Sequence, residues 1–110
     1  MNLFLLAGAI SVGFAGELRT QVLDLLGGYE ETASPASLQA LGPTVSDELL
    51  SIAQDSTVPA SRRARAVHAL GWFPSDTTRT FLVGTLQGAD STLARKAAYA
   101  LANYIAVATA

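Results

Sequence analysis

Residues 62–73, with the sequence RRARAVHALGWF, decide the fold because their pattern returns near the end of the chain. Small and apolar residues recur here at i, i+3, i+4 and i+7, the spacing of one helical face. They are Ala66, Ala69, Leu70 and Phe73. The same spacing returns 31 residues later, in Ala97, Ala100, Leu101 and Tyr104. Because a repeat period between about 20 and 50 residues is typical of stacked helical hairpins, the sequence predicts an all-α protein.

The segment before each of these faces carries a second repeated pattern. Its apolar positions in the first copy are Val45, Leu49, Ile52 and Ala53. The matching positions 33 residues later are Thr78, Leu82, Thr85 and Leu86. Each unit therefore contains two helices, and the units span residues 44–74 and 75–106. The core that both patterns predict comprises Leu49, Ile52, Ala66, Leu70, Phe73, Leu82, Leu86, Ala97, Leu101 and Tyr104.

Length and composition describe one domain. The chain has 110 residues, of which 50% are hydrophobic and 15% are charged. That balance excludes general disorder. The absence of cysteine excludes disulfides, thiolate zinc sites and a cysteine nucleophile. Abundant alanine and few aromatic residues favour closely packed helices.

The charges are distributed unevenly along the chain. Residues 1–55 hold seven acids and one base, Arg19, which gives −6. Residues 56–110 hold six bases and two acids, which gives +4. Two interpretations fit this division. Either neighbouring helices of one fold complement each other in charge, or one face is dedicated to binding a charged partner.

Residues 1–15 resemble a secretory signal peptide. Thirteen residues from Leu3 to Ala15 carry no charge, and Gly13 and Ala15 put small residues where a signal peptidase reads. We expect cleavage after Ala15 and export of the mature chain. The alternatives are an uncleaved segment that tethers the protein to a membrane, or a buried helix of the domain.

Residues 16–43 form a helical segment ahead of the repeats. Leu18, Val22, Leu25 and Leu26 share one face of an amphipathic helix that Gly27 ends. A surface loop follows over residues 29–33. Ser34 and Pro35 then have the residue types that begin a short helix.

The ends of the four repeat helices are also marked in the sequence. Thr44 offers an N-cap for a helix that runs to residue 54, and Pro74 ends the helix over residues 62–73. Ser75 or Asp76 caps the third helix, which ends near residue 87. Asp90 or Ser91 opens the last, from residue 92 to about 105.

The string R-x-x-A-x-x-A-L-G follows an Asp-containing loop, at Arg63, Ala66, Ala69, Leu70 and Gly71. It resembles a HEAT-type repeat, and most of all the short HEAT-like repeats of bacterial proteins first noted in phycobilisome lyases. The resemblance covers residues 44–105. It implies an α-solenoid of antiparallel helix pairs that holds protein partners on an exposed helical face. Residues 44–110 then carry the two repeats, and residues 16–43 are an N-terminal helical cap.

The resemblance also assigns two polar residues. Asp55 and Arg63 occupy the family positions whose side chains usually reach between adjacent repeats. The second repeat departs from this pattern, because Ala94 stands where the arginine is expected. With the signal segment, the bacterial resemblance implies a location in the periplasm or outside the cell.

Catalytic and metal-binding motifs do not emerge from the sequence. His68 is the single histidine and has no H-x-x-x-H or H-E-x-x-H partner, so we expect neither a metal nor a general base there. No G-x-S-x-G elbow or phosphate-binding loop is present. The basic turn at Arg62, Arg63 and Arg65 lacks aromatic residues, and the isoelectric point is about 5.1. We therefore expect no nucleic-acid binding and no cofactor.

The second helix of each pair should line the concave face, so Arg65, His68 and Trp72 are the candidate contacts for a protein partner. Trp72 lies off the core stripe, and it either anchors a partner or covers the neighbouring helix. The function we predict is an exported, non-catalytic interaction module. The alternatives are a lyase-like enzyme subunit or accessory factor carrying such repeats, and a membrane-tethered helical scaffold.

The C-terminal end lacks a polar cap. Leu101, Tyr104 and Ile105 are followed only by small and apolar residues, whereas a terminal repeat normally needs a polar outer face. One interpretation is that a second copy of the chain, or a partner bearing further repeats, covers this end. The other is that Tyr104 and Ile105 pack back onto Leu82 and Leu86.

Overall fold

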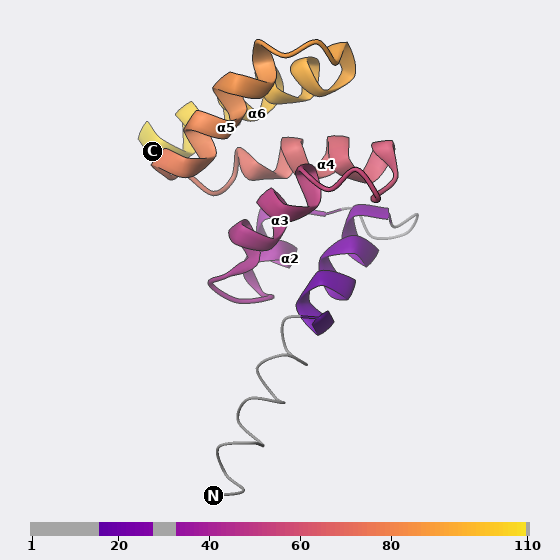
Figure 1. The fold of residues 1–110 in the computed structure, drawn as a ribbon. Coiled ribbons are helices and arrows are strands. Elements are labelled where there is room, and N and C mark those ends of the chain that lie inside the picture. The colour runs from indigo at the N-terminus through magenta and orange to yellow at the C-terminus, as the bar shows by residue number, and fades with distance from the viewer. Residues whose placement is uncertain (1–15, 28–32, 110) are drawn as a thin grey trace, which may run out of the picture.

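The computed structural model describes residues 16–27 and 33–109 of the chain, and this part is all-helical (Figure 1). Residues 16–27 are helical, and the helices α2 to α6 follow within residues 33–109. No strand occurs in these two ranges. The predicted signal peptide, residues 1–15, lies outside them, so export stays a prediction.

The helix over residues 16–27 uses the apolar face that the sequence predicts. Val22 and Leu26 are buried in the core, and Leu18 and Leu25 are partly buried against it. Arg19 lies off this face and reaches Glu48, where its Nη1 is 2.9 Å from a carboxylate oxygen. The helix therefore joins the domain through both an apolar stripe and an ion pair.

Helix α2 (Pro35–Gln39) is short and strongly capped. The Oγ of Ser34 accepts a hydrogen bond from the backbone N–H of Ser37, and the Ser37 Oγ accepts one from the Ser34 N–H. This reciprocal capping box satisfies donors that a helix end leaves free. Gly42 follows with φ +115, a left-handed conformation that glycine adopts without steric cost.

Helices α3 (Val45–Ala53) and α4 (Ala60–Leu70) form the first hairpin. Both backbone N–H and Oγ of Thr57 donate to Asp55 Oδ1, at 2.9 and 2.6 Å, and fix the loop between them. Thr44 is the N-cap residue of α3, as predicted, but its side chain makes no capping bond. Its backbone carbonyl still accepts from the N–H of Glu48.

Helices α5 (Asp76–Leu86) and α6 (Ser91–Thr109) form the second hairpin. Ser75 caps α5 by accepting from Thr78, and Asp90 accepts from the N–H of Leu93 at the start of α6. Helix α6 runs past the expected end near residue 105. No glycine or proline interrupts residues 91–109, and alanine there is the strongest helix former.

Helix α4 ends earlier than expected, at Leu70 instead of Phe73. The next three backbone N–H groups bond to carbonyls three residues back, from Gly71 to His68, from Trp72 to Ala69 and from Phe73 to Leu70. Such bonds tighten the last turn into 3₁₀ geometry. Pro74 then prevents continuation.

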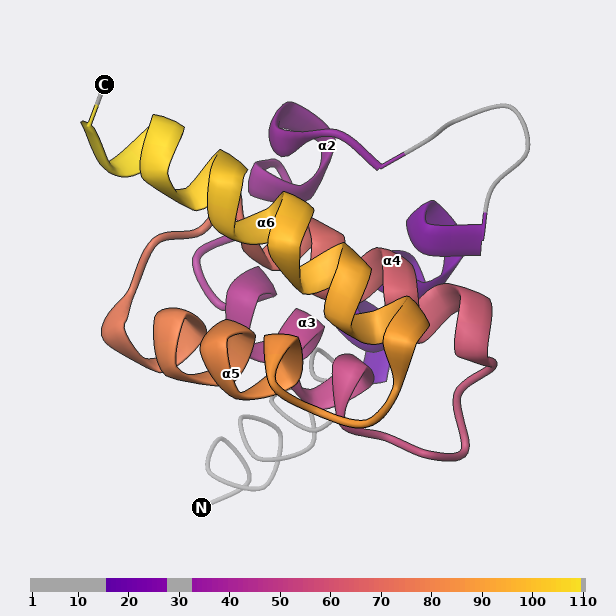
Figure 2. The same ribbon diagram turned by 90° about the horizontal axis from the view of Figure 1, so that it is seen from above.

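The two hairpins meet where α6 packs across α4, as Figure 2 shows. Their closest approach lies at Gly71 and Ala100. A Cβ added to Gly71 would lie 2.2 Å from the backbone oxygen of Ala100, well inside contact distance. Small residues on the repeated face therefore allow the backbones of α4 and α6 to approach closely.

Most of the predicted core residues are buried. The fully buried ones are Leu49, Ile52, Ala66, Leu70, Leu82 and Ala97. Phe73 and Leu101 are partly buried and pack against the core. Tyr104 is also partly buried, and its hydroxyl donates to the carbonyl of Ser75 at 3.3 Å.

Leu86 is a correction, since its side chain is 43% exposed and does not belong to the core. Its counterpart in the first unit, Ala53, is only 6% exposed. The two positions differ in burial because their helices have different neighbours in the fold. The first unit has the helix of residues 16–27 on one side and the second unit on the other, whereas nothing in the described part of the chain covers the outside of α5.

Candidate functional site

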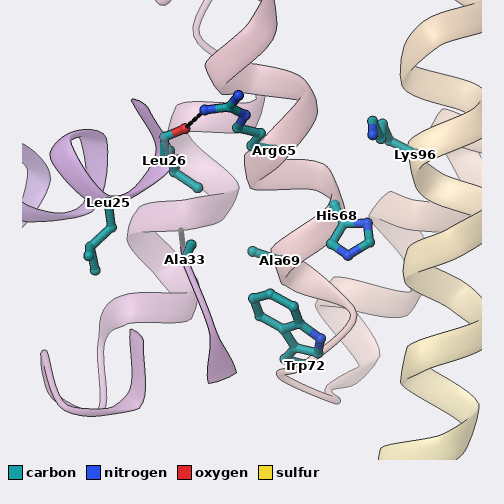
Figure 3. Close-up of a pocket in the computed structure, with 8 residues that line it drawn as sticks. All are labelled: Leu25, Leu26, Ala33, Arg65, His68, Ala69, Trp72 and Lys96. Carbon is teal, nitrogen blue, oxygen red and sulfur yellow. Dashed lines mark hydrogen bonds between the residues drawn. The ribbon is translucent and has the colours of Figure 1, made fainter. Parts of the chain in front are cut away.

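The three residues predicted to contact a partner share one pocket, of about 240 Å³ (Figure 3). Arg65, His68 and Trp72 come from α4, where they lie at i, i+3 and i+7 on one face. The pocket lies between α4, α6 and the helix of residues 16–27. The described residues that line it are Leu25, Leu26, Ala33, Arg65, His68, Ala69, Trp72 and Lys96. We call these eight residues the α4 pocket.

Arg65 is held in place at the edge of this pocket. Its Nη1 donates to the backbone oxygen of Leu26 at 2.6 Å, drawn as a dashed line in Figure 3. Leu26 is the second-last residue of the described helical stretch 16–27. A guanidinium carries five N–H donors, so this bond fixes the group while leaving it donors for a ligand.

His68 and Trp72 form an aromatic pair one helical turn apart. Their ring centroids are 5.6 Å apart and the rings are nearly perpendicular, at 84°. This edge-to-face arrangement is a favoured geometry for aromatic pairs. Both side chains are half-buried, and they therefore present a fixed aromatic surface to the pocket.

The α4 pocket is cationic and partly apolar. Arg65 and Lys96 carry positive charge on two neighbouring helices, and no carboxylate occurs among the eight lining residues. Burial lowers the pKa of His68 below its ordinary value of 6.5, and the charge of Lys96 lowers this pKa further. The imidazole is therefore neutral at neutral pH, and the positive charge comes from Arg65 and Lys96 alone.

Sequence reasoning missed Lys96 and the wall formed by Leu25, Leu26 and Ala33. Lys96 does have a signal, because it is the repeat counterpart of Arg65, 31 residues later. Leu25, Leu26 and Ala33 have no such signal in the sequence, since they belong to segments outside the repeats. Their place beside α4 depends on how the first helix packs.

Asp55 and Arg63, expected at positions that reach between adjacent repeats, form no hydrogen bond or ion pair with described residues of the second repeat. The Nε of Arg63, in the first turn of α4, donates to the carbonyl of Val58 in the preceding loop at 3.0 Å. Asp55 instead pairs with Arg19 and accepts from Thr57. Hydrogen bonds from Thr57 lower the pKa of Asp55 most, and the nearby Arg19 lowers it as well. Asp55 thus links the α3–α4 loop to the helix of residues 16–27.

Arg19 is the polar residue that sequence reasoning overlooked. Besides Asp55 and Glu48, it donates to the Oγ of Ser51 at 3.3 Å. Its signal was available, because it is the single base among the seven acids of residues 1–55. A lone base among many acids is a natural partner for several of them.

The ion pairs do not connect the two oppositely charged halves of the sequence. Within residues 16–27 and 33–109 they join Arg19 to Glu48, Arg19 to Asp55 and Arg79 to Asp76. Each pair therefore lies within one half. Among the described residues, charge complementarity between the halves is thus not carried by ion pairs.

Metal-binding clusters and membrane-spanning helices are both absent from the described residues. Across residues 16–27 and 33–109, no three His, Asp or Glu side chains come close enough to hold a metal ion. In the same ranges, none of the helices has the length and apolar character needed to cross a bilayer. Ser34 and Ser75, two of the described serines, act as helix caps.

Comparisons with protein families, curated proteins and solved structures found no match to this chain.

Proposed function

We propose that this chain is an exported, non-catalytic HEAT-like repeat module that binds a protein partner at the α4 pocket. One observation carries the proposal. Arg65, His68 and Trp72, predicted as contacts from α4 alone, lie around a single pocket together with Lys96. Aromatic residues and arginine are enriched among the residues that dominate protein interfaces.

The arrangement of the hairpins supports the solenoid part of the proposal. Helices α4 and α6, the second members of the two pairs, pack against each other. Gly71 of the repeat motif lies at their closest contact. In an α-solenoid, each repeat contacts only its neighbours, and a chain with two repeats would use this contact to stack them.

Two alternatives remain as further proposals. A lyase-like subunit or accessory factor requires acid and base groups that converge on a cleft; the α4 pocket offers His68 as its one titratable group near neutral pH. A membrane-tethered scaffold requires residues 1–15 to stay uncleaved. N-terminal sequencing of the exported product separates tethering from release.

Site-specific photo-crosslinking in the exporting cell tests the proposed function. Benzoylphenylalanine replaces Tyr99, which lies one helical turn beyond the pocket residue Lys96, in one variant and Arg79 in a control; both side chains are exposed on helices. We expect an adduct with a distinct protein from position 99 and none with that protein from position 79. The same adduct from both positions, or none from position 99, would contradict binding at the α4 pocket.

A second copy of the chain is the second candidate partner. It is favoured by the outer α5–α6 face, which we define as Arg79, Val83, Leu86, Ala98, Ala102 and Ile105. All six residues are exposed, and the three large apolar ones strongly so: Val83 by 40%, Leu86 by 43% and Ile105 by 61%. These values favour the interpretation in which the C-terminal end is left for a partner to cover.

The charges on α5 fit an antiparallel copy of itself. Arg79, Val83 and Leu86 lie at i, i+4 and i+7, and Asp90 follows just beyond the end of the helix. In an isologous dimer, residue i meets j while j meets i. Arg79 of one copy would then face Asp90 of the other, with the two apolar residues between them.

A further inference from the structure

The α4 pocket combines features that recognise one chemical group. Arg65 and Lys96 supply positive charge from α4 and α6, while Leu25, Ala33 and Ala69 supply apolar surface. Figure 3 shows Arg65, His68 and Trp72 following one another along the same side of α4. A ligand that fits the pocket would therefore have an anionic group beside Arg65 and Lys96 and an apolar group against the apolar surface.

Arg65 is suited to bind a carboxylate. Its bond to the Leu26 carbonyl fixes the plane of the guanidinium before a ligand arrives. The planar fork of N–H groups matches the two oxygens of a carboxylate, and such charge-assisted bonds are about twice as strong as neutral ones. Preorganisation of this kind lowers the entropy lost on binding.

The size of the pocket limits the apolar part of the ligand. Its volume is about 240 Å³, whereas pockets for drug-sized ligands hold roughly 300–1,000 Å³. One ring or one branched alkyl group therefore fits. The edge-to-face pair of His68 and Trp72 offers an aromatic surface against which that group would pack.

We propose that the α4 pocket binds a carboxylate attached to a single aryl or alkyl group. The carboxylate faces Arg65 and Lys96, and the apolar group lies against Trp72 and Ala69. Two sources supply this chemistry, a free organic acid or the C-terminal carboxylate of a protein whose last residue is apolar. The second source rests on the proposed function, and the first does not.

Trp72 makes the test specific, because it is the single tryptophan of the chain and lines the pocket. Its fluorescence is followed while the full chain is titrated with 4-phenylbutyrate, with 4-phenylbutyramide and with inorganic phosphate at low ionic strength. Charged hydrogen bonds are stronger than neutral ones, so we expect the carboxylate to bind at least about tenfold more tightly than the amide. Phosphate, which lacks an apolar part, should bind as weakly as the amide or more so.

Matched variants locate the effect. Arg65→Gln and Lys96→Gln should each reduce affinity for 4-phenylbutyrate several-fold and leave affinity for the amide unchanged. Arg79→Gln removes a base from the outer α5–α6 face and should change neither. The proposal is wrong if the amide or phosphate binds as well as the carboxylate, if no probe binds, or if Arg79→Gln has the same effect as Arg65→Gln.

A third arm separates the two sources. A tripeptide ending in phenylalanine is compared as free acid and as amide with 4-phenylbutyrate. Tighter binding of the peptide acid assigns the pocket to a protein C-terminus, and tighter binding of 4-phenylbutyrate assigns it to a free acid. Selectivity for carboxylate without an adduct from position 99 would overturn the proposed function alone. An adduct without that selectivity would overturn only the present inference.

Discussion

Gly71 shows how one residue controls the contact between the two hairpins. Since an added Cβ would lie 2.2 Å from the Ala100 oxygen, Gly71→Ala must push α6 away from α4. Overpacking of this kind costs typically 1–3 kcal/mol. We expect a loss of about that size in the free energy of unfolding, measured by urea denaturation.

Gly84 provides a matched control within α5. Nothing lies within 4 Å of a Cβ added there, and glycine inside a helix is less stable than alanine by about 0.5–1 kcal/mol. Gly84→Ala should therefore stabilise the protein slightly. If Gly71→Ala also stabilises it, the close α4–α6 contact does not exist as described.

His68 gives the stability a dependence on pH. Burial lowers its pKa in the folded chain below 6.5, so the unfolded chain takes up a proton first as the pH falls. The free energy of unfolding is therefore highest above about pH 6.5, and it decreases as the pH falls from there to the pKa of His68 in the folded chain. Urea denaturation between pH 5 and 7.5 should show stability rising with pH, and His68→Gln should remove that slope. An unchanged slope in His68→Gln would rule out His68 as the cause.

Only part of the candidate site is predictable from single residues. Arg65, His68 and Trp72 share a face of α4, and helical periodicity alone places them together. Lys96 and Leu25 reach the same pocket from other helices. Their positions depend on the separation and crossing of helices, which side-chain packing sets and periodicity does not encode.

At the scale of a helix, the sequence repeat predicts the burial of some residues well, whereas the burial of others depends on the neighbouring helices. Leu70 is fully buried, as its apolar stripe predicts. Leu86 continues an equally regular stripe, yet it is exposed because no further unit covers α5. Periodicity identifies the inward face of a helix, but it does not say whether a second face will also be covered.

Leu70 and Leu86 therefore form a matched pair for aspartate substitution. Leu70→Asp removes a burial worth about 1.5–3 kcal/mol and adds an unpaired buried charge. Since a domain is stable by about 5–15 kcal/mol, we expect loss of the cooperative thermal transition in circular dichroism. Leu86→Asp should melt close to the wild type. Retained cooperative melting of Leu70→Asp at the wild-type temperature would contradict its place in the core.

Helix ends were predictable where a side chain performs the capping. Ser34, Ser75 and Asp90 each accept a backbone N–H, as their residue types suggest. Thr44 has the right residue type but makes no such bond. The sequence does not predict the end of α6, because no glycine or proline marks it and alanines recur among residues 102–108.

At the scale of the whole molecule, charge and exposure distinguish two surfaces. The bases Arg65 and Lys96 line the α4 pocket, while Arg19 forms ion pairs with Glu48 and Asp55 in the acidic first half. The outer α5–α6 face is instead apolar apart from Arg79, and Asp90 follows beyond the end of α5. The all-helical fold followed from the repeat, whereas the location of each surface required the packing.

Self-association is the prediction for the outer α5–α6 face. Sedimentation velocity of the full chain should show a dimer that increases with concentration, and Leu86→Lys should return it to monomer by placing a charge in the contact. Val107→Lys is the control. Val107 is also exposed, but it lies about 200° around α6 from Ile105. A monomer at every concentration, or an equal effect of both variants, would contradict dimerisation through this face.

Binding at the α4 pocket is tested most directly by nitrogen-15 NMR of the full chain, with and without the purified protein that cross-links to position 99. The single indole N–H of Trp72 gives one resolved signal for the pocket. We expect this signal and the amides of Arg65 and His68 to shift, while those of Val83 and Ile105 stay in place. Shifts confined to the outer α5–α6 face, with the Trp72 signal unmoved, would show that the pocket is not the binding surface.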